Sequence, residues 1–193
     1  MSKQNFGNNS FMKNLRETNS LQKTLLDARK IKLFDEGDTG RNINENLEDA
    51  LFKSVVVVCF GTPMIAGDSF APLVAESLIQ DLDVPCFVYG TPVAPINGKN
   101  MERWLDFITV VHKDSIVLAI DASLGERVGS IVVRKDGVCP AAVKGRKKRF
   151  GDVGVLGVVA KAGEDPLASL LEAEFDKVAS LADHAARLVK DAI

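Results

Sequence analysis

Two unbroken apolar runs of strand length dominate the hydrophobic pattern of this chain. Residues 55–60 read Val-Val-Val-Val-Cys-Phe, and residues 115–121 read Ser-Ile-Val-Leu-Ala-Ile-Asp. A strand that is covered on both faces requires continuous rather than alternating hydrophobicity. Both runs therefore predict central strands of a mostly parallel sheet. We expect them to be neighbours, in the common 2-1-3 winding.

Helical periodicity follows each predicted strand. Apolar residues recur at three- and four-residue spacings, which is typical of helices that bury one face. Asn100 is expected to cap one helix through its side chain. The first ten residues are polar and are expected to be disordered, and 34–46 has the composition of a loop. The predicted helices are 10–32, 69–81, 100–111 and 166–192, with a short helical turn at 46–53.

The remaining strands complete an α/β fold. Residues 84–89 and 153–161 are predicted strands, and 129–134 is expected to form a hairpin with 138–143 across Lys-Asp-Gly, because Asp-Gly favours a tight turn. The pattern predicts a three-layer α/β/α sandwich whose sheet is mostly parallel with an antiparallel addition. We divide the chain into an N-terminal extension, residues 1–50, and one α/β domain, residues 51–193.

Composition narrows the class of protein. The chain is 46% hydrophobic and 26% charged with a formal net charge of −2, which gives no reason to propose nucleic acid as a partner. No apolar run reaches the roughly 18 to 20 residues of a membrane span, and the amino terminus lacks the apolar segment of a secretory signal. Cys59, Cys86 and Cys139 form no CxxC pair. They indicate core residues in a reducing cytosolic compartment and no metal or redox site.

Asp68 and Asp121 are the candidate chemical groups. Each lies in or beside the turn that follows a predicted central strand, and ligands of open α/β sheets bind at that edge. Asp68 also precedes a helix, where a carboxylate can simply cap backbone N–H groups. If the two carboxylates converge, they have two uses: sharing a proton to activate water, or holding a divalent cation.

Other familiar sites are disfavoured. The turn 61–67 is neither GxGxxG nor GxxxxGK[ST], and an aspartate at the helix start would repel phosphate. His112 and His184 are expected at the opposite edge of the sheet and on the polar side of the last helix, so Ser69 and Ser123 lack a visible base. The basic run 144–149 is either a solvated turn or a surface that attracts an acidic substrate.

Four motifs in order resemble one known family. They are Phe60-Gly-Thr-(x4)-Gly-Asp-Ser, Val88-Tyr-Gly-Thr-Pro, Ile120-Asp-Ala-Ser-Leu-Gly and Gly151-Asp-Val-Gly-Val-Leu-Gly-Val-Val. Together they resemble the YyaC-like sporulation proteins of spore-forming Firmicutes. That family is similar to the spore germination protease and, more remotely, to hydrogenase maturation endopeptidases. The resemblance implies a phosphorylase/hydrolase-like fold.

The resemblance also implies an activity. Asp68 and Asp121 match the two carboxylates of the germination protease, which implies a sporulation-associated aspartic-type endopeptidase without a cofactor, acting on small spore proteins in the cytoplasm of the forespore or sporulating cell. Hydrogenase maturation enzymes hold a metal there with an added histidine, but this chain has none between His112 and His184. Ala71 stands where the motif usually has glycine. A catalytically silent module that binds a spore protein, and a metal-dependent hydrolase, remain alternatives.

We assign substrate binding to residues expected beside the pair. Backbone N–H groups of the turn 61–67 are candidates for holding an oxyanion, and a lysine of the basic run is a candidate for attracting substrate. The predicted substrate-binding residues are Gly61, Thr62, Gly67, Ser69, Tyr89, Ser123 and Lys144.

Overall fold

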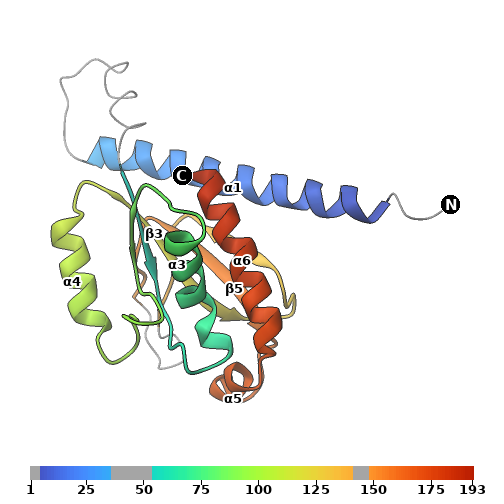
Figure 1. Cartoon of the computed structure of the whole chain (residues 1–193). Coiled ribbons are helices and arrows are strands. Elements are labelled where there is room, and N and C mark those ends of the chain that lie inside the picture. The colour runs from blue at the N-terminus through green and yellow to red at the C-terminus, as the bar shows by residue number, and fades with distance from the viewer. Residues whose placement is uncertain (1–4, 36–53, 141–147) are drawn as a thin grey trace.

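The computed structural model describes residues 5–35, 54–140 and 148–193 (Figure 1). A five-stranded sheet forms the centre, with strand order β2-β1-β3-β5-β4. The strands are β1 (Val55–Cys59), β2 (Phe87–Tyr89), β3 (Ile116–Leu124), β4 (Ile131–Arg134) and β5 (Val153–Ala160). The helices are α1 (Asn5–Asp35), the 3-10 turn η1 (Gly67–Ser69), α3 (Phe70–Gln80), α4 (Met101–Val111), α5 (Pro166–Leu171) and α6 (Phe175–Ala192).

The sheet has the predicted topology. β1 pairs in parallel with β2 and with β3, β3 pairs in parallel with β5, and β4 is antiparallel to β5. This confirms the predicted fold class, with its mostly parallel sheet and antiparallel addition. Strand order reverses between β1 and β3, so the crevice expected for a ligand lies outside the carboxyl ends of these two strands.

Both faces of the central strands are covered, as their continuous hydrophobicity predicts. Val55, Val57 and Cys59 point into a core built with α1, α3 and α6, whereas Val56 and Val58 point into a second core built with α4. All five residues of β1 are buried. Figure 1 shows α3 and α6 in front of the sheet and α4 beside it.

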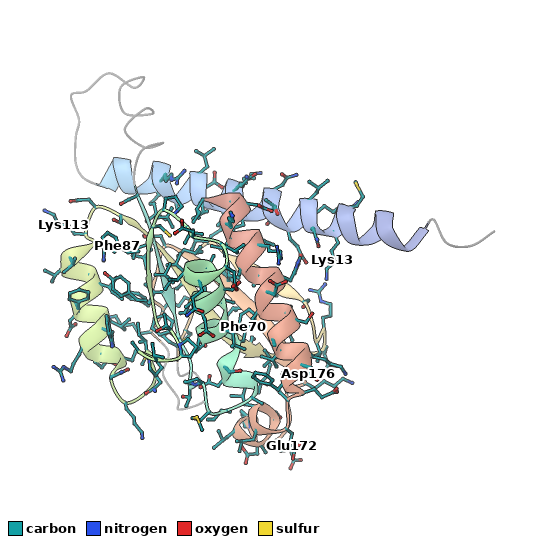
Figure 2. The ribbon with its side chains drawn as sticks, in the orientation of Figure 1. Lys13, Phe70, Phe87, Lys113, Glu172 and Asp176 are labelled. Carbon is teal, nitrogen blue, oxygen red and sulfur yellow. The ribbon has the colours of Figure 1, made fainter. Side chains whose placement is uncertain are left out.

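Phe70 anchors the start of α3 to the sheet. Its side chain is fully buried, and its ring tip rests on β5 where residue 157 has no side chain. A Cβ at Gly157 would overlap the ring and lie 2.6 Å from its Cε1. Phe70 lies at the start of α3 (Figure 2) and directly follows η1, so this contact holds the turn that carries Asp68 at the carboxyl edge of the sheet.

The predicted hairpin is wrong in its partner. β4 pairs with β5 and not with residues 138–140, which are the described part of the predicted partner 138–143. Val138 instead forms a single antiparallel bridge with Phe150. The long apolar strand β5 offers β4 a whole edge to pair with. The Asp-Gly turn therefore begins a longer connection between β4 and β5.

Three helix and strand boundaries also differ from the prediction. The last helix breaks into α5 and α6, and Leu167, Leu171 and Phe175 are 46%, 55% and 51% exposed rather than buried. The strand predicted at 84–89 forms only over β2, since Pro85 has no N–H to donate. Helix α1 begins at Asn5, so the expected disorder of 1–10 is wrong from that residue onward.

Smaller errors concern single side chains. The apolar spacing of the helices predicts that Ile79 of α3 and Val111 of α4 are buried, but they are 45% and 54% exposed. Asn100 makes no side-chain cap; it accepts from the N–H of Asn97 and donates to the carbonyl of Pro95 instead.

Helix α1 is packed on the domain. Leu21 and Leu25 are buried in the core shared with α6, and Gln22 donates to the carbonyl of Asp191. The division at residue 50 and the helical turn at 46–53 fall outside the described residues and stay predictions. Within the described ranges, no helix is both long and apolar enough to cross a membrane.

We predict that Gly157→Ala destabilises the fold by about 1 to 3 kcal/mol, because the added methyl group overpacks the site against the Phe70 ring. Gly125→Ala is the matched control, since a Cβ there would make an ordinary contact, 3.5 Å from Val158 Cγ1. Urea unfolding measures both. The Gly157→Ala, Phe70→Leu double variant should lose less stability than the two single losses added together; simple additivity would contradict the contact.

Candidate functional site

The two candidate carboxylates lie at the same edge of the sheet. Cys59, the last residue of β1, pairs with Ile120 of β3, and Asp121 is the next residue along β3. After β1 the chain passes through the turn 61–66 and returns as η1, which packs against β3 and carries Asp68. The structure therefore brings both aspartates to the point where strand order reverses.

The turn around Asp68 is closed by its own carboxylate. The N–H of Thr62 donates to Asp68 Oδ2 at 2.7 Å. Gly61 is required by close approach, because a Cβ there would overlap the carbonyl oxygen of Asp68 and lie 3.0 Å from Pro72 Cδ. Gly67 is similarly packed against Leu170 of α5, whose Cδ2 would be 2.9 Å from an added Cβ. Asp68 thus sits on a turn held from two sides.

The pKa of Asp121 is strongly perturbed. Burial, and secondly the negative charge of Asp68, raise the pKa of its carboxyl well above the usual range, while the N–H of Ala122, which donates to Oδ1 at 2.9 Å, opposes the rise. The charge of Asp121 in turn helps burial raise the pKa of the Cys59 thiol. Asp121 therefore favours the protonated form to higher pH than an ordinary aspartate.

The arrangement supplies one proton donor and one base. A protonated carboxyl donates a hydrogen bond, whereas an ionised carboxylate accepts a proton from water. Burial, and secondly the charge on Asp68, disfavour the charged form of Asp121, so its carboxyl keeps its proton to higher pH than an ordinary aspartate. This is the electrostatic condition that acid–base chemistry by two carboxylates needs.

Of the predicted substrate-binding residues, Gly61, Thr62 and Gly67 belong to the Asp68 turn. Ser69 is buried, and its hydroxyl donates to the carbonyl of Ala66 at 2.7 Å, which is a local structural bond. Ser123 lies two residues beyond Asp121 on β3 and donates to the carbonyl of Leu124 at 3.4 Å.

Tyr89 is not brought to the pair. The Tyr89 hydroxyl is 2.8 Å from His112 Nε2, and its ring packs with Trp104 and Phe107 on the side of α4. Lys144 lies outside the described residues. The structure thus assigns Tyr89 to an aromatic cluster beside the sheet.

Two neighbours of the pair were missed by sequence reasoning. Leu170 supports the turn at Gly67, and Cys59 is buried at the end of β1, where the charge of Asp121 reaches its thiol. Both residues belong to ordinary apolar stretches of the sequence. Nothing in the local sequence pattern therefore indicates that they lie beside a functional site. Asp152, at the start of β5, binds the N–H of Val117 at 2.8 Å and so belongs to the opposite edge of the sheet.

A metal-bound version of the site fits these residues poorly. In the described part of the chain, no three His, Cys, Asp or Glu side chains are grouped as ligands for an ion. His112 is bonded to Tyr89, and His184 lies 2.8 Å from Glu17 of α1. Among the described residues, this edge of the sheet therefore offers the two carboxylates without a third His, Cys, Asp or Glu grouped with them.

Comparison with known sequences gives one family and one curated relative. The profile of a family described as "Protein of unknown function (DUF1256)" matches residues 35–187. YyaC of Bacillus subtilis (strain 168), described as uncharacterized, is 36% identical over 124 residues. That alignment covers 63% of this chain and 60% of YyaC.

Comparison with solved structures gives hydrogenase maturation proteases. HycI, a [NiFe] hydrogenase maturation protease from Thermococcus kodakarensis KOD1, superposes with a TM-score of 0.50 at 19% identity, covering 76% of this chain and 97% of HycI. A hydrogenase 3 maturation protease has a TM-score of 0.46 at 14% identity, covering 70% of this chain and 88% of that one. The first of these likenesses shows a shared fold.

We predict that Asp68→Asn lowers the pKa of Asp121 while leaving it above the usual range, because the charge is removed and burial, the larger cause, remains. Carboxyl NMR titration measures the change. Asp183→Asn, which alters an exposed ion pair with Arg187, is the control and should leave the pKa of Asp121 unchanged. An unchanged value in Asp68→Asn would disprove the coupling.

We further predict that Asp121→Asn stabilises the protein at neutral pH. The folded-state pKa of Asp121 is raised, so the folded state binds the extra proton, and stability falls as pH rises from the ordinary aspartate pKa through the raised one. A one-unit rise corresponds to about 1.4 kcal/mol. Urea unfolding should show the gain at neutral pH and its loss as pH falls from the raised pKa to the ordinary aspartate pKa. A gain independent of pH would contradict this origin.

Proposed function

This chain belongs to the DUF1256 family, and from that membership and its site we propose that it is an endopeptidase in which Asp68 and Asp121 activate water. The observation that carries the proposal is the raised pKa of Asp121, caused in part by the charge of Asp68. Strongly perturbed groups in a crevice at a strand-order reversal are typical of catalytic sites. The fold shared with HycI, a maturation protease, supports the same reaction class.

In the proposed mechanism, Asp68 is the base and Asp121 the acid. Ionised Asp68 takes a proton from water as the water oxygen attacks the scissile carbonyl carbon. Protonated Asp121 gives its proton to the carbonyl oxygen, which forms a tetrahedral diol. The diol then collapses: the C–N bond breaks, a proton moves from Asp68 to the leaving nitrogen, and a diol proton returns to Asp121. Each cycle restores both carboxyl groups.

The turn residues have supporting roles in this proposal. Thr62 orients Asp68 through the bond from its backbone N–H, and Gly61 permits the close packing of the turn. Ser123, on β3 beyond Asp121, is proposed to contact substrate, and Lys144 to attract it. Tyr89, the last residue of β2, is proposed to act indirectly, because its hydrogen bond with His112 fixes the position of β2.

The substrates proposed are small spore proteins, and the place of action is the cytoplasm of the forespore or sporulating cell. The support for both is the resemblance of the four sequence motifs to YyaC-like sporulation proteins. A metal-dependent hydrolase using the same two carboxylates and water is the weaker third candidate.

A second candidate function has an observation of its own. Each carboxylate accepts a backbone N–H from its own segment, Asp68 from Thr62 and Asp121 from Ala122. Carboxylates held in this way can serve as structural groups. A silent peptidase-like module that binds a spore protein in the same crevice would keep this arrangement without cleaving a bond.

We predict that Asp68→Asn and Asp121→Asn each lower cleavage by roughly 10²- to 10⁴-fold, the usual contribution of a general acid or base. Purified protein is incubated with small spore proteins, with and without chelator, and products are identified by mass spectrometry. Activity should decline as pH rises through the raised pKa of Asp121, because the residue then loses the proton that it donates. Asp183→Asn is the matched control.

The outcomes separate the three candidates. Loss in both variants without chelator sensitivity supports the aspartate pair. Chelator sensitivity supports the metal-dependent hydrolase, and binding without cleavage that both variants retain supports the silent module.

A further inference from the structure

Helix α5 and the first residue of α6 present large apolar side chains to solvent beside the candidate site. Leu167, Leu171 and Phe175 are 46%, 55% and 51% exposed, within one short stretch of the chain. Leu167 and Leu171 are four residues apart and so share one face of α5. We call this surface the α5 patch; it comprises Leu167, Leu171 and Phe175 together with Glu164, Asp165, Glu172, Glu174 and Asp176.

The exposure of the patch is not a result of a frayed helix. Asp165 caps α5, with Oδ1 accepting from the N–H groups of Leu167 at 2.9 Å and Ala168 at 3.2 Å. On the inner side, Leu170 is 7% exposed and packs against Gly67. The helix is therefore held at both its cap and its inner face, and the outer leucines stay exposed on a fixed support.

The patch is strongly acidic. Residues 161–177 contain two lysines and five carboxylates, a net charge of −3 in a chain whose total is −2. Lys177 is paired with Glu174 at 2.6 Å. In the described ranges, no cation pairs with Glu164, Glu172 or Asp176. Figure 2 shows Glu172 on the outer side of α5 and Asp176 at the start of α6.

The patch adjoins the turn that carries Asp68. α5 follows the carboxyl end of β5, and η1 follows that of β1, so both lie at the same edge of a parallel sheet. Leu170 packs on Gly67, which is the residue before Asp68. A polypeptide bound on the outer face of α5 would therefore continue toward the crevice within a few residues.

We infer that the α5 patch docks a segment of a partner polypeptide in which large apolar residues alternate with lysine or arginine. This inference rests on the proposed function and deepens it, because the docked segment would belong to the substrate. Apolar residues of the partner would cover the leucines and Phe175, and its cations would meet the unpaired carboxylates. The negative charge disfavours nucleic acid and anionic membranes as occupants.

Docking on the α5 patch, away from the reacting bond, would assist cleavage by positioning the substrate. Binding energy gathered away from the scissile bond holds that bond between the two carboxylates. The partner specificity would then reside in α5, whereas the chemistry resides in the Asp68 turn and β3.

The test measures binding of fluorescent peptides to the full chain by anisotropy. The probe is a short peptide of alternating leucine and lysine, compared with peptides of leucine and glutamate and of serine and lysine. We expect the leucine–lysine peptide to bind best, and Leu171→Ser and Phe175→Ser each to weaken it about tenfold. Val110→Ser is the matched control, since Val110 on α4 is 73% exposed but distant in sequence from the patch.

Charge variants give a second measurement that does not alter the apolar surface. Glu172→Gln with Asp176→Asn should weaken binding several-fold at low salt and reduce its salt dependence. Thermal unfolding checks that every variant is folded. Three outcomes would overturn the inference. The charge and serine variants could bind the leucine–lysine peptide as tightly as the wild type does. The wild type could bind the leucine–glutamate peptide equally well, or bind neither peptide.

Cleavage assays separate this inference from the proposed function. Peptide binding at the patch without cleavage of any substrate would reject the endopeptidase and retain the docking surface. Cleavage whose KM is unchanged in Leu171→Ser and Phe175→Ser would reject the docking surface and retain the endopeptidase. A raised KM in both variants, with kcat unchanged, supports both.

Discussion

The parallel pairing of β1 with β3 is the constraint on which the rest of the structure depends. It runs in register from Val55↔Ile116 to Cys59↔Ile120, and every other strand is added outside this pair. Because the two strands are parallel neighbours, the residues that follow them must meet at one edge. Asp121 follows directly, and the turn after β1 brings Asp68 back to the same edge. The candidate site is a consequence of this pairing.

Placing two carboxylates at that edge has an energetic cost. Burial raises the pKa of Asp121 and the charge of Asp68 raises it further, so the ionised pair is disfavoured in the folded state. The fold offsets this cost with the backbone N–H groups of Thr62 and Ala122, and with the packing of Phe70 on Gly157. Functional sites commonly contain such an unfavourable group, whose cost is offset by the packing and hydrogen bonds around it.

Particular residues explain which sequence predictions succeeded. The valines of β1 and the apolar run of β3 have no polar position for solvent, so burial on both faces and a central place in the sheet follow directly. The terminal helix was predicted as continuous because α5 and α6 have similar periodicity. Periodicity does not reveal that Leu170 packs on Gly67 while α6 packs on the sheet, so it could not predict that the helix divides between them.

The sequence by itself determined the two central strands β1 and β3, their place as neighbours, and the presence of acidic residues after both, because local hydrophobic pattern and chain direction suffice for these features. Only the tertiary structure decided that Tyr89 turns toward His112, that Ser69 is used within its own turn, and that the charge of Asp68 acts on Asp121. Side-chain direction and electrostatic coupling depend on distances between segments remote in sequence. Such distances exist only once the chain is folded.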